Sequence, residues 1–183
     1  MVKPYKRSML IILDGWGVRE NRQGNAVAQA NTPFLDNIQK QYPSSQLLTF
    51  GNAVGLPDKI MGNSEVGHLN IGAGRIVYQD LLRIDKSIED GSFFENNAIC
   101  RIMERVKKNH SKLHLMGLVS DGGVHSQLTH LLTLLDMAGR RHLKQVVVHA
   151  ILDGRDTPPN NGVKYLSTLQ SHIKASGVGT IAS

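Results

Sequence analysis

The stretch that organises the chain is residues 61–75, MGNSEVGHLNIGAGR. Its four glycines allow tight turns and let a ligand approach the backbone closely. Ser64 stands between two of them, where a glycine-rich turn is expected to run into a helix. The free N–H groups and the dipole at a helix start favour a bound anion such as phosphate. Ser64 is therefore either a nucleophile at an anion site or an N-cap, and Gly67 three residues on cannot complete a capping box.

Three apolar runs in the chain each end on an Asp-Gly pair, with helix-like patterns between them. The runs are residues 9–13, 113–119 and 145–152. Short, continuous apolar runs are typical of strands buried on both faces of a parallel sheet. Residues 180–183 resemble the start of a further strand. The alternation of strands and helices predicts an α/β fold with a parallel sheet.

Apolar residues at helical spacing predict the intervening helices. The first helix is expected to begin with Thr32 as N-cap and Pro33 as its first residue, and to stop before Pro43. Further helices are expected at residues 80–89, 93–110, 128–138 and 163–174. The sequence therefore supplies enough helices to connect parallel strands.

Asp14 directly follows the first apolar run. In open α/β sheets, ligands bind beyond the carboxyl ends of strands, where a carboxylate could hold a divalent metal ion. The alternative is that Asp14 and Gly15 only begin a turn. If residues 46–50 form a second strand leading toward Ser64, two strand ends could bring Asp14 and Ser64 together for metal-assisted phosphoryl transfer.

The charge of the chain is basic but scattered. There are 21 Lys and Arg against 15 Asp and Glu, a net charge of +6, which suits an anionic partner such as phosphate. Without a basic arm or a set of stacking aromatics, the sequence argues against nucleic-acid binding. No run has the length of a membrane span or of a signal-peptide core, and the cytoplasm is the expected location. The single cysteine, Cys100, is expected to be a buried, inert thiol.

Four stretches resemble the motifs of one known family. They are LDGWG (13–17), GNSEVGH (62–68, continuing to Arg75), SDGGVHS (120–126) and LDGRDTPP (152–159). In order and spacing they are similar to the motifs of cofactor-independent phosphoglycerate mutases, which belong to the alkaline phosphatase superfamily. The resemblance runs from about residue 9 to the last residue. Chains of that family are more than twice as long, so this sequence is expected to be an amino-terminal portion.

The resemblance implies a domain organisation and an activity. Residues 1–76 would begin a phosphatase-like, metal-binding domain, and residues 77–183 would begin an inserted α/β phosphotransferase domain that holds the substrate. The implied reaction is the glycolytic interconversion of 3-phosphoglycerate and 2-phosphoglycerate, an isomerisation through a phosphoserine intermediate that is independent of 2,3-bisphosphoglycerate. The expected partner is a small phosphorylated substrate, and the full-length protein would be a monomer.

The resemblance also assigns roles to particular residues. Ser64 would be the nucleophile and, with Asp14, a ligand of one of two manganese ions, or of other divalent ions. His125, Arg155 and Asp156 would contact the substrate. Considered without the resemblance, His125 could equally be a solvated loop residue, and Arg155 with Asp156 could be a surface ion pair.

The remaining motif residues are expected to have structural roles. Asp121 and Asp153 fit turn and scaffold positions, whereas His68 and Asn70 would support the loop around Ser64. Gln127 departs from the family, which often has a second histidine there. The family's other metal ligands and its further substrate arginines and lysine lie beyond these residues. This chain alone is therefore expected to hold part of one metal site and to be inactive.

Two other interpretations remain open. The chain could derive from another enzyme of the superfamily, a phosphopentomutase or a metal-dependent phosphatase, although the stretch DGRDTPP (153–159) argues against both. It could also be an inactive module that only binds phosphorylated ligands. Turnover of 3-phosphoglycerate would separate these interpretations.

Overall fold

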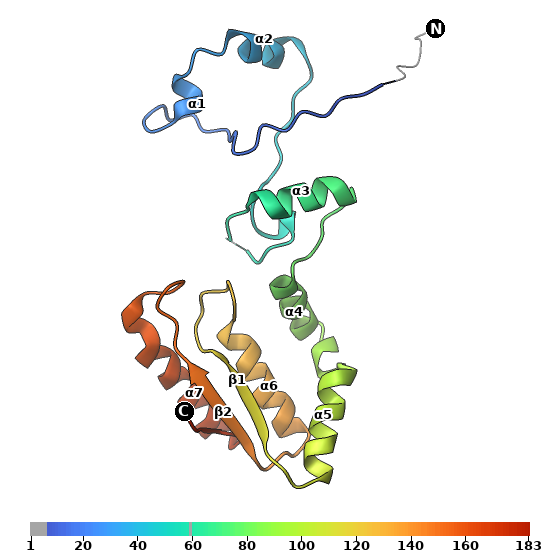
Figure 1. Ribbon diagram of the computed structural model, residues 1–183, viewed down its shortest axis with the longest axis vertical. Coiled ribbons are helices and arrows are strands. Elements are labelled where there is room, and N and C mark those ends of the chain that lie inside the picture. The colour runs from blue at the N-terminus through green and yellow to red at the C-terminus, as the bar shows by residue number, and fades with distance from the viewer. Residues whose placement is uncertain (1–6, 59) are drawn as a thin grey trace.

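The computed structural model describes residues 7–58 and 60–183. Figure 1 shows an α/β unit that contains the carboxyl-terminal half of the chain, the helix α3 beyond it, and an open amino-terminal segment that carries α1 and α2. The helices are α1 Ala26–Gln29, α2 Pro33–Gln41, α3 Ser64–Ala73, α4 Asp80–Glu89, α5 Asn97–Lys108, α6 Leu128–Arg140 and α7 Gly162–Ser176. The strands are β1 Leu113–Leu118, β2 Val146–Ile151 and β3 Thr180–Ile181, and the short 3-10 helices are η1 Gly51–Val54, η2 Ser92–Glu95 and η3 Pro159–Asn161.

The sheet is parallel and has the order β1-β2-β3. Helix α6 connects β1 to β2, and α7 connects β2 to β3. The predicted α/β class, the parallel sheet and its last strand are thus confirmed. The core contains residues from the sheet and from the helices packed on it, among them Val148, Leu135 and Leu169, each at most 1% exposed.

The strands are buried on one face, not on both as predicted. Inward-facing residues such as Val146 and Val148 are buried, whereas Met116 on β1 is 73% exposed. In the described part of the chain, no element covers the face that carries Met116. Apolar residues on both sides of a strand therefore do not imply that both faces are covered.

The predicted strand at residues 9–13 is wrong, because these residues form no regular structure. Their side chains are exposed, from 42% for Ile12 to 85% for Met9. A buried parallel strand needs neighbouring strands and covering helices, and residues 7–58 and 60–183 provide neither beside this segment. Residues 46–50 also form no strand, apart from one antiparallel bridge between Phe50 and Met61.

The helix predictions hold with two corrections. Thr32 lies at the N-cap position of α2, but its hydroxyl donates to Asp36 Oδ1 (3.0 Å) and caps no backbone N–H. The helix expected at residues 93–110 is divided into η2 and α5. Asn96 separates them because its backbone (φ −59°, ψ 110°) is not helical and its side-chain oxygen accepts the N–H groups of Ala98 and Ile99.

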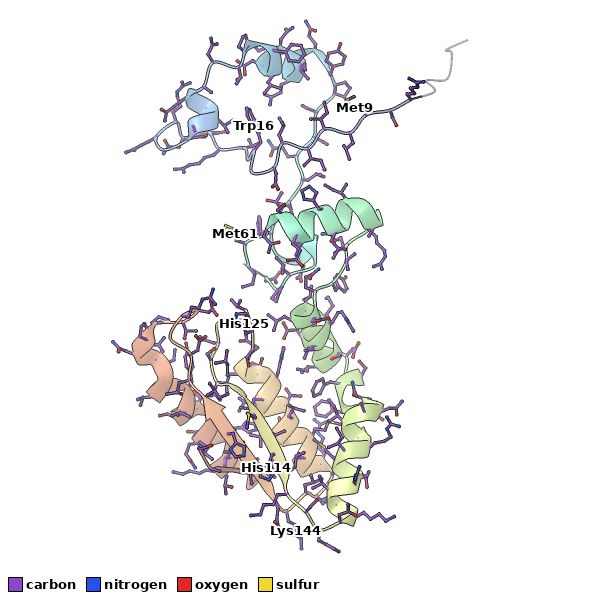
Figure 2. The ribbon with its side chains drawn as sticks, viewed as in Figure 1. Met9, Trp16, Met61, His114, His125 and Lys144 are labelled. Carbon is purple, nitrogen blue, oxygen red and sulfur yellow. The ribbon has the colours of Figure 1, made fainter. Side chains whose placement is uncertain are left out.

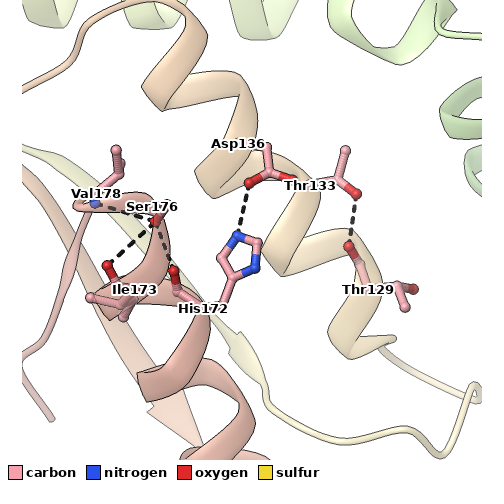
Figure 3. A network of polar contacts seen from close by, with 7 residues as sticks. All are labelled: Thr129, Thr133, Asp136, His172, Ile173, Ser176 and Val178. Atoms are coloured by element: carbon pink, nitrogen blue, oxygen red, sulfur yellow. Dashed lines mark hydrogen bonds and ion pairs between the residues drawn. The ribbon is translucent and has the colours of Figure 1, made fainter.

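Polar side chains join α6 to α7, as Figure 3 shows. His172 Nε2 on α7 lies 2.8 Å from Asp136 Oδ1 on α6. Two hydroxyls donate hydrogen bonds to backbone carbonyls of their own helix. Thr133 Oγ1 donates to the Thr129 carbonyl, and Ser176 Oγ donates to the His172 carbonyl. The contact between His172 and Asp136 thus joins the two crossover helices.

Candidate functional site

Helix α3 presents Ser64 as its first residue. The N-cap is Asn63, whose side-chain oxygen accepts the N–H of Val66 at 3.1 Å. The hydroxyl of Ser64 is therefore not needed for capping and is free for other chemistry. The turn before the helix requires Gly62, because a β-carbon there would lie 1.9 Å from the carbonyl oxygen of Thr49. The sequence signal for the cap was present, since asparagine is as good an N-cap as serine.

The Ser64 hydroxyl donates a hydrogen bond to Asp14, fifty positions earlier in the chain. The distance from Ser64 Oγ to Asp14 Oδ2 is 2.5 Å. His68, one helical turn further, places Nδ1 3.2 Å from Ser64 Oγ and 2.9 Å from the Ser64 carbonyl oxygen. With the proton on Nδ1, the ring would donate to that carbonyl and support the first turn of α3. The structure thus brings Asp14 and Ser64 together although residues 9–13 form no strand.

These groups line a hollow of about 730 Å³. Its walls are largely apolar and include Leu13, Trp16 and Phe50, whereas Asp14, Ser64 and His68 supply polar atoms. Concave, mainly apolar walls with a few convergent polar groups are typical of ligand sites. The hollow also lies at the amino terminus of α3, where backbone N–H groups favour an anion.

The oxygen donors at this site suit a hard divalent cation. Asp14 Oδ2 and Ser64 Oγ converge, and carboxylate and hydroxyl oxygens are ligands that Mn²⁺ and Mg²⁺ accept. Within residues 7–58 and 60–183, no group of three or more His, Cys, Asp or Glu side chains is placed to hold a metal ion. The residues therefore fit part of a metal site.

A second group of candidate residues lies at the carboxyl edge of the sheet. The loops that follow β1 and β2 pack together there, and His125 Nε2 lies 3.8 Å from Asp156 Oδ2. Arg155 is exposed beside them. Gly122 permits this approach, since a β-carbon on it would lie 3.1 Å from Thr157 Cγ2. All three residues expected to contact substrate are thus gathered on adjacent loops.

Asp153 holds the second of these loops in place. Its Oδ1 accepts the N–H groups of Arg155 (3.0 Å) and Asp156 (3.2 Å), and its Oδ2 accepts the hydroxyl of buried Ser120 (3.0 Å). The backbone hydrogen bonds, first that from Arg155, lower the pKa of Asp153 below its usual value. The predicted scaffold role of Asp153 is borne out by these contacts.

Asp121 and Asn70 are also structural. Asp121 accepts a hydrogen bond from Tyr165, which ties the loop after β1 to α7. The side chain of Asn70 donates to the Val54 carbonyl (3.0 Å) and accepts from the Val77 N–H (2.7 Å), joining α3 to its flanking segments.

The two groups of candidate residues remain separate. Among the described residues, no polar contact joins Ser64 or Asp14 to His125, Arg155 or Asp156. In Figure 2, His125 lies at the end of the α/β unit nearer to Met61, and Lys144 lies at the opposite end.

No helix in the described part of the chain is long and apolar enough to cross a membrane.

By architecture, this is an α/β protein with candidate residues at a helix amino terminus and at the carboxyl edge of a parallel sheet. The protein-family model described as BPG-independent PGAM N-terminus (iPGM_N) matches residues 84–183, more than half of the chain. The chain belongs to this family. One solved structure that it resembles is the Leishmania mexicana phosphoglycerate mutase crystallised at low cobalt concentration, with a TM-score of 0.66 and 34% identity, over 84% of this chain and 29% of that one.

Curated relatives support the same assignment. The chain is 51% identical over 180 residues to the 2,3-bisphosphoglycerate-independent phosphoglycerate mutase of Synechocystis, covering 98% of this chain and 34% of that one. It is 55% identical over 180 residues to the enzyme of the same name from Salinibacter ruber, covering 97% and 34%. The chain therefore spans about a third of the length of the curated relatives it matches.

Proposed function

We propose that this chain supplies the nucleophile and part of the substrate site of a phosphoglycerate mutase that interconverts 3-phosphoglycerate and 2-phosphoglycerate in glycolysis. The observation that carries the proposal is the hydrogen bond from Ser64 Oγ to Asp14 Oδ2 at the start of α3. It joins two residues from separate motifs in an exposed hollow whose helix amino terminus favours phosphate. The name shared by the relatives supports the same substrate.

In the proposed reaction, Ser64 Oγ attacks the phosphorus of 3-phosphoglycerate, the P–O bond to the glycerate oxygen breaks, and the proton of the serine hydroxyl ends on that leaving oxygen. The bound glycerate then reorients, and its 2-hydroxyl takes the phosphoryl group from phosphoserine, so that Ser64 regains a proton. A hydroxyl is a weak nucleophile at neutral pH and needs an adjacent base or a cation. Asp14 accepts a hydrogen bond from the hydroxyl and so aligns the serine oxygen for attack. Asp14 and Ser64 would also hold a divalent ion, such as manganese, which would neutralise charge on the phosphoryl group. The backbone N–H groups at the start of α3 would bind phosphoryl oxygens.

The substrate's remaining groups would be held by the loops at the carboxyl edge of the sheet. The Arg155 guanidinium is always charged and has five N–H donors, so it suits a carboxylate or phosphate. His125 can donate to the same anion, and Asp156 can accept hydrogen bonds from the hydroxyls of glycerate.

We assign residues 1–76 to the metal-binding, phosphatase-like domain and residues 77–183 to the inserted phosphotransferase domain. Transfer would then need the two groups of residues to close on one substrate.

A chimera tests this proposal. This chain would replace the matching third of the Synechocystis relative, and conversion of 3-phosphoglycerate would be measured with added Mn²⁺. We expect the chimera to be active and the Ser64→Ala variant to lose at least a factor of about 10³ in kcat, because the nucleophile is removed.

The matched control is Ser167→Ala. Ser167 lies on α7, where its hydroxyl donates only to the Val163 carbonyl, and its loss should leave kcat within about twofold. An active chimera that keeps its kcat after Ser64→Ala would overturn the proposal. Turnover of another phosphate ester, with none of 3-phosphoglycerate, would favour a different enzyme of the superfamily.

A further inference from the structure

Two histidines share an unusual backbone conformation. In residues 7–58 and 60–183, His110 (φ 49°) and His142 (φ 58°) are the only residues other than glycine with positive φ. Each lies two positions beyond a helix, α5 or α6. Glycine is the usual residue at this position, because a side chain is strained in the left-handed region. Strain retained at two equivalent positions is a reason to look for a function there.

Both histidines line the same hollow, which has a volume of about 260 Å³. Lys107, from the last turn of α5, and Lys144, from the loop before β2, line it as well. No carboxylate is among the lining residues, and neither lysine makes an ion pair within the described chain. The hollow therefore collects two positive charges and two imidazoles without a balancing acid.

Two of these four residues, Lys107 and His142, also line a neighbouring hollow that contains Glu95 and Glu104. Arg141 pairs with Glu104 at 3.2 Å, so the nearby carboxylate is already engaged. Neither glutamate lines the hollow itself, and no ion pair joins either one to Lys107 in the described part of the chain. Arg140 lies over the Phe94 ring, 3.7 Å from its centroid.

The helix carboxyl termini would ordinarily disfavour an anion. Here, closing hydrogen bonds already occupy carbonyl oxygens of the last turns. The N–H of Ser111 donates to Val106 (3.1 Å), and the N–H of Leu143 donates to Ala138 (3.0 Å). An anion in the hollow would therefore depend on the positive charges of Lys107 and Lys144.

We propose that this hollow binds a small phosphorylated anion through Lys107, Lys144, His110 and His142. The site lies at the amino-terminal edge of the sheet, at the end of the α/β unit where Lys144 is labelled in Figure 2 and opposite His125. It is thus distinct from the site proposed for phosphoglycerate and does not depend on that function. The site could not be predicted from the sequence, because its basic residues lie apart along the chain and only the fold brings the ends of α5 and α6 together.

Inorganic phosphate is the probe for the first test. It would be titrated into the 183-residue chain, with sodium chloride adjusted to keep the ionic strength constant, while backbone amide NMR signals are followed. We expect saturable shifts centred on residues 107–111 and 142–145. The double variant Lys107→Ala, Lys144→Ala should weaken this binding at least tenfold.

A control variant with the same loss of charge distinguishes specific phosphate binding in the hollow from nonspecific attraction of phosphate to a basic protein. The double variant Lys112→Ala, Lys174→Ala removes the same charge outside the hollow and should change the affinity less than twofold. Exchanging both histidines for glycine keeps the helix ends and removes the imidazoles. That variant should fold at least as well and still bind phosphate at least threefold more weakly. Equal losses in both lysine variants, an absence of saturation, or shifts centred on residues 120–126 and 153–156 would each overturn the proposal.

Discussion

Ser64 differs from the chain's other hydrogen-bonded serines in where its hydroxyl points. Ser126, Ser167 and similar residues donate to backbone carbonyls, which consumes the hydroxyl in local structure. Ser120 donates to the Asp153 carboxylate but is only 1% exposed. Ser64 alone, among the hydrogen bonds of the described residues, combines a carboxylate acceptor with an exposed position in a hollow. This combination, more than the presence of a serine at a helix start, supports a nucleophilic role.

Asp153 gives a pH-dependent prediction at the same scale. Hydrogen bonds from Arg155, Asp156 and Ser120 lower its folded-state pKa below the ordinary 3.8. A carboxylate with a lowered pKa stabilises the fold above its unfolded pKa, and this stabilisation is lost as pH falls through the folded value. Asp153→Asn should therefore lower the thermal midpoint at pH 7, and the difference from the parent should shrink below about pH 4.

The control for Asp153 is Glu89→Gln, which removes one charge from a side chain that makes no hydrogen bond or ion pair among those found in the described chain. Thermal midpoints at pH 7 and pH 3 would be compared for all three proteins. A difference between Asp153→Asn and the parent that grows as the pH falls would contradict the assigned role.

At the level of elements, the helices were the most predictable part of the chain. Helices α4, α6 and α7 follow their apolar spacing closely, because burying one face needs only a neighbour nearby in sequence. Residues 9–13 show the opposite case. Their apolar character predicts a strand, but strand formation depends on a partner that the sequence of the run cannot specify, and none lies beside it in residues 7–58 and 60–183.

The candidate site was predictable to the extent that it rested on motifs. Asp14 and Ser64 are brought together as expected, and the contact between His125 and Asp156 joins two residues that were each expected to contact substrate. The cap at Asn63 was missed, because Ser64 itself is a good N-cap and sequence could not choose between two adjacent candidates. The left-handed conformations of His110 and His142 also gave no sequence signal, since glycine is the usual marker.

The turn before α3 provides a prediction for an element. Gly62→Ala would force a β-carbon against the Thr49 carbonyl oxygen, 1.9 Å away, so the turn or the residues 49–50 must shift. We expect the variant to lose roughly 1–3 kcal/mol in free energy of unfolding, as overpacked sites do. Urea denaturation would measure it.

Gly67→Ala is the matched control. A β-carbon on Gly67 meets nothing within 4 Å, and alanine favours a helix interior. This variant should be neutral or up to about 1 kcal/mol more stable. Equal effects of the two substitutions would show that the tight turn at Gly62 is not needed.

For the whole molecule, exposed surface is the outstanding feature. The accessible area is 13884 Å² for a mass of 20.1 kDa. A compact monomer of that mass would expose about 8,700 Å². Much of the excess lies on the amino-terminal segment, where Met9, Leu10 and Leu47 are each more than 70% exposed. The α/β unit, by contrast, contains nearly all of the buried core.

Limited proteolysis should reflect this contrast. We expect brief digestion with a nonspecific protease to cut first within residues 7–50, which have few buried contacts, and to leave residues 97–181 intact. Mass spectrometry of the first products would locate the cuts. Initial cleavage inside α6 or α7 would contradict the division of stability described above.

The most direct test of the central claim is to locate the transferred phosphoryl group. The chimera with the Synechocystis relative would be mixed with 3-phosphoglycerate and Mn²⁺, quenched in acid within the first turnovers, and digested for mass spectrometry. Phosphate on Ser64, absent from the Ser64→Ala variant and from protein quenched without substrate, is the predicted result. An active chimera whose phosphate appears on another residue, or on none under conditions that trap the intermediate in the parent relative, would contradict the assignment of Ser64 as the nucleophile.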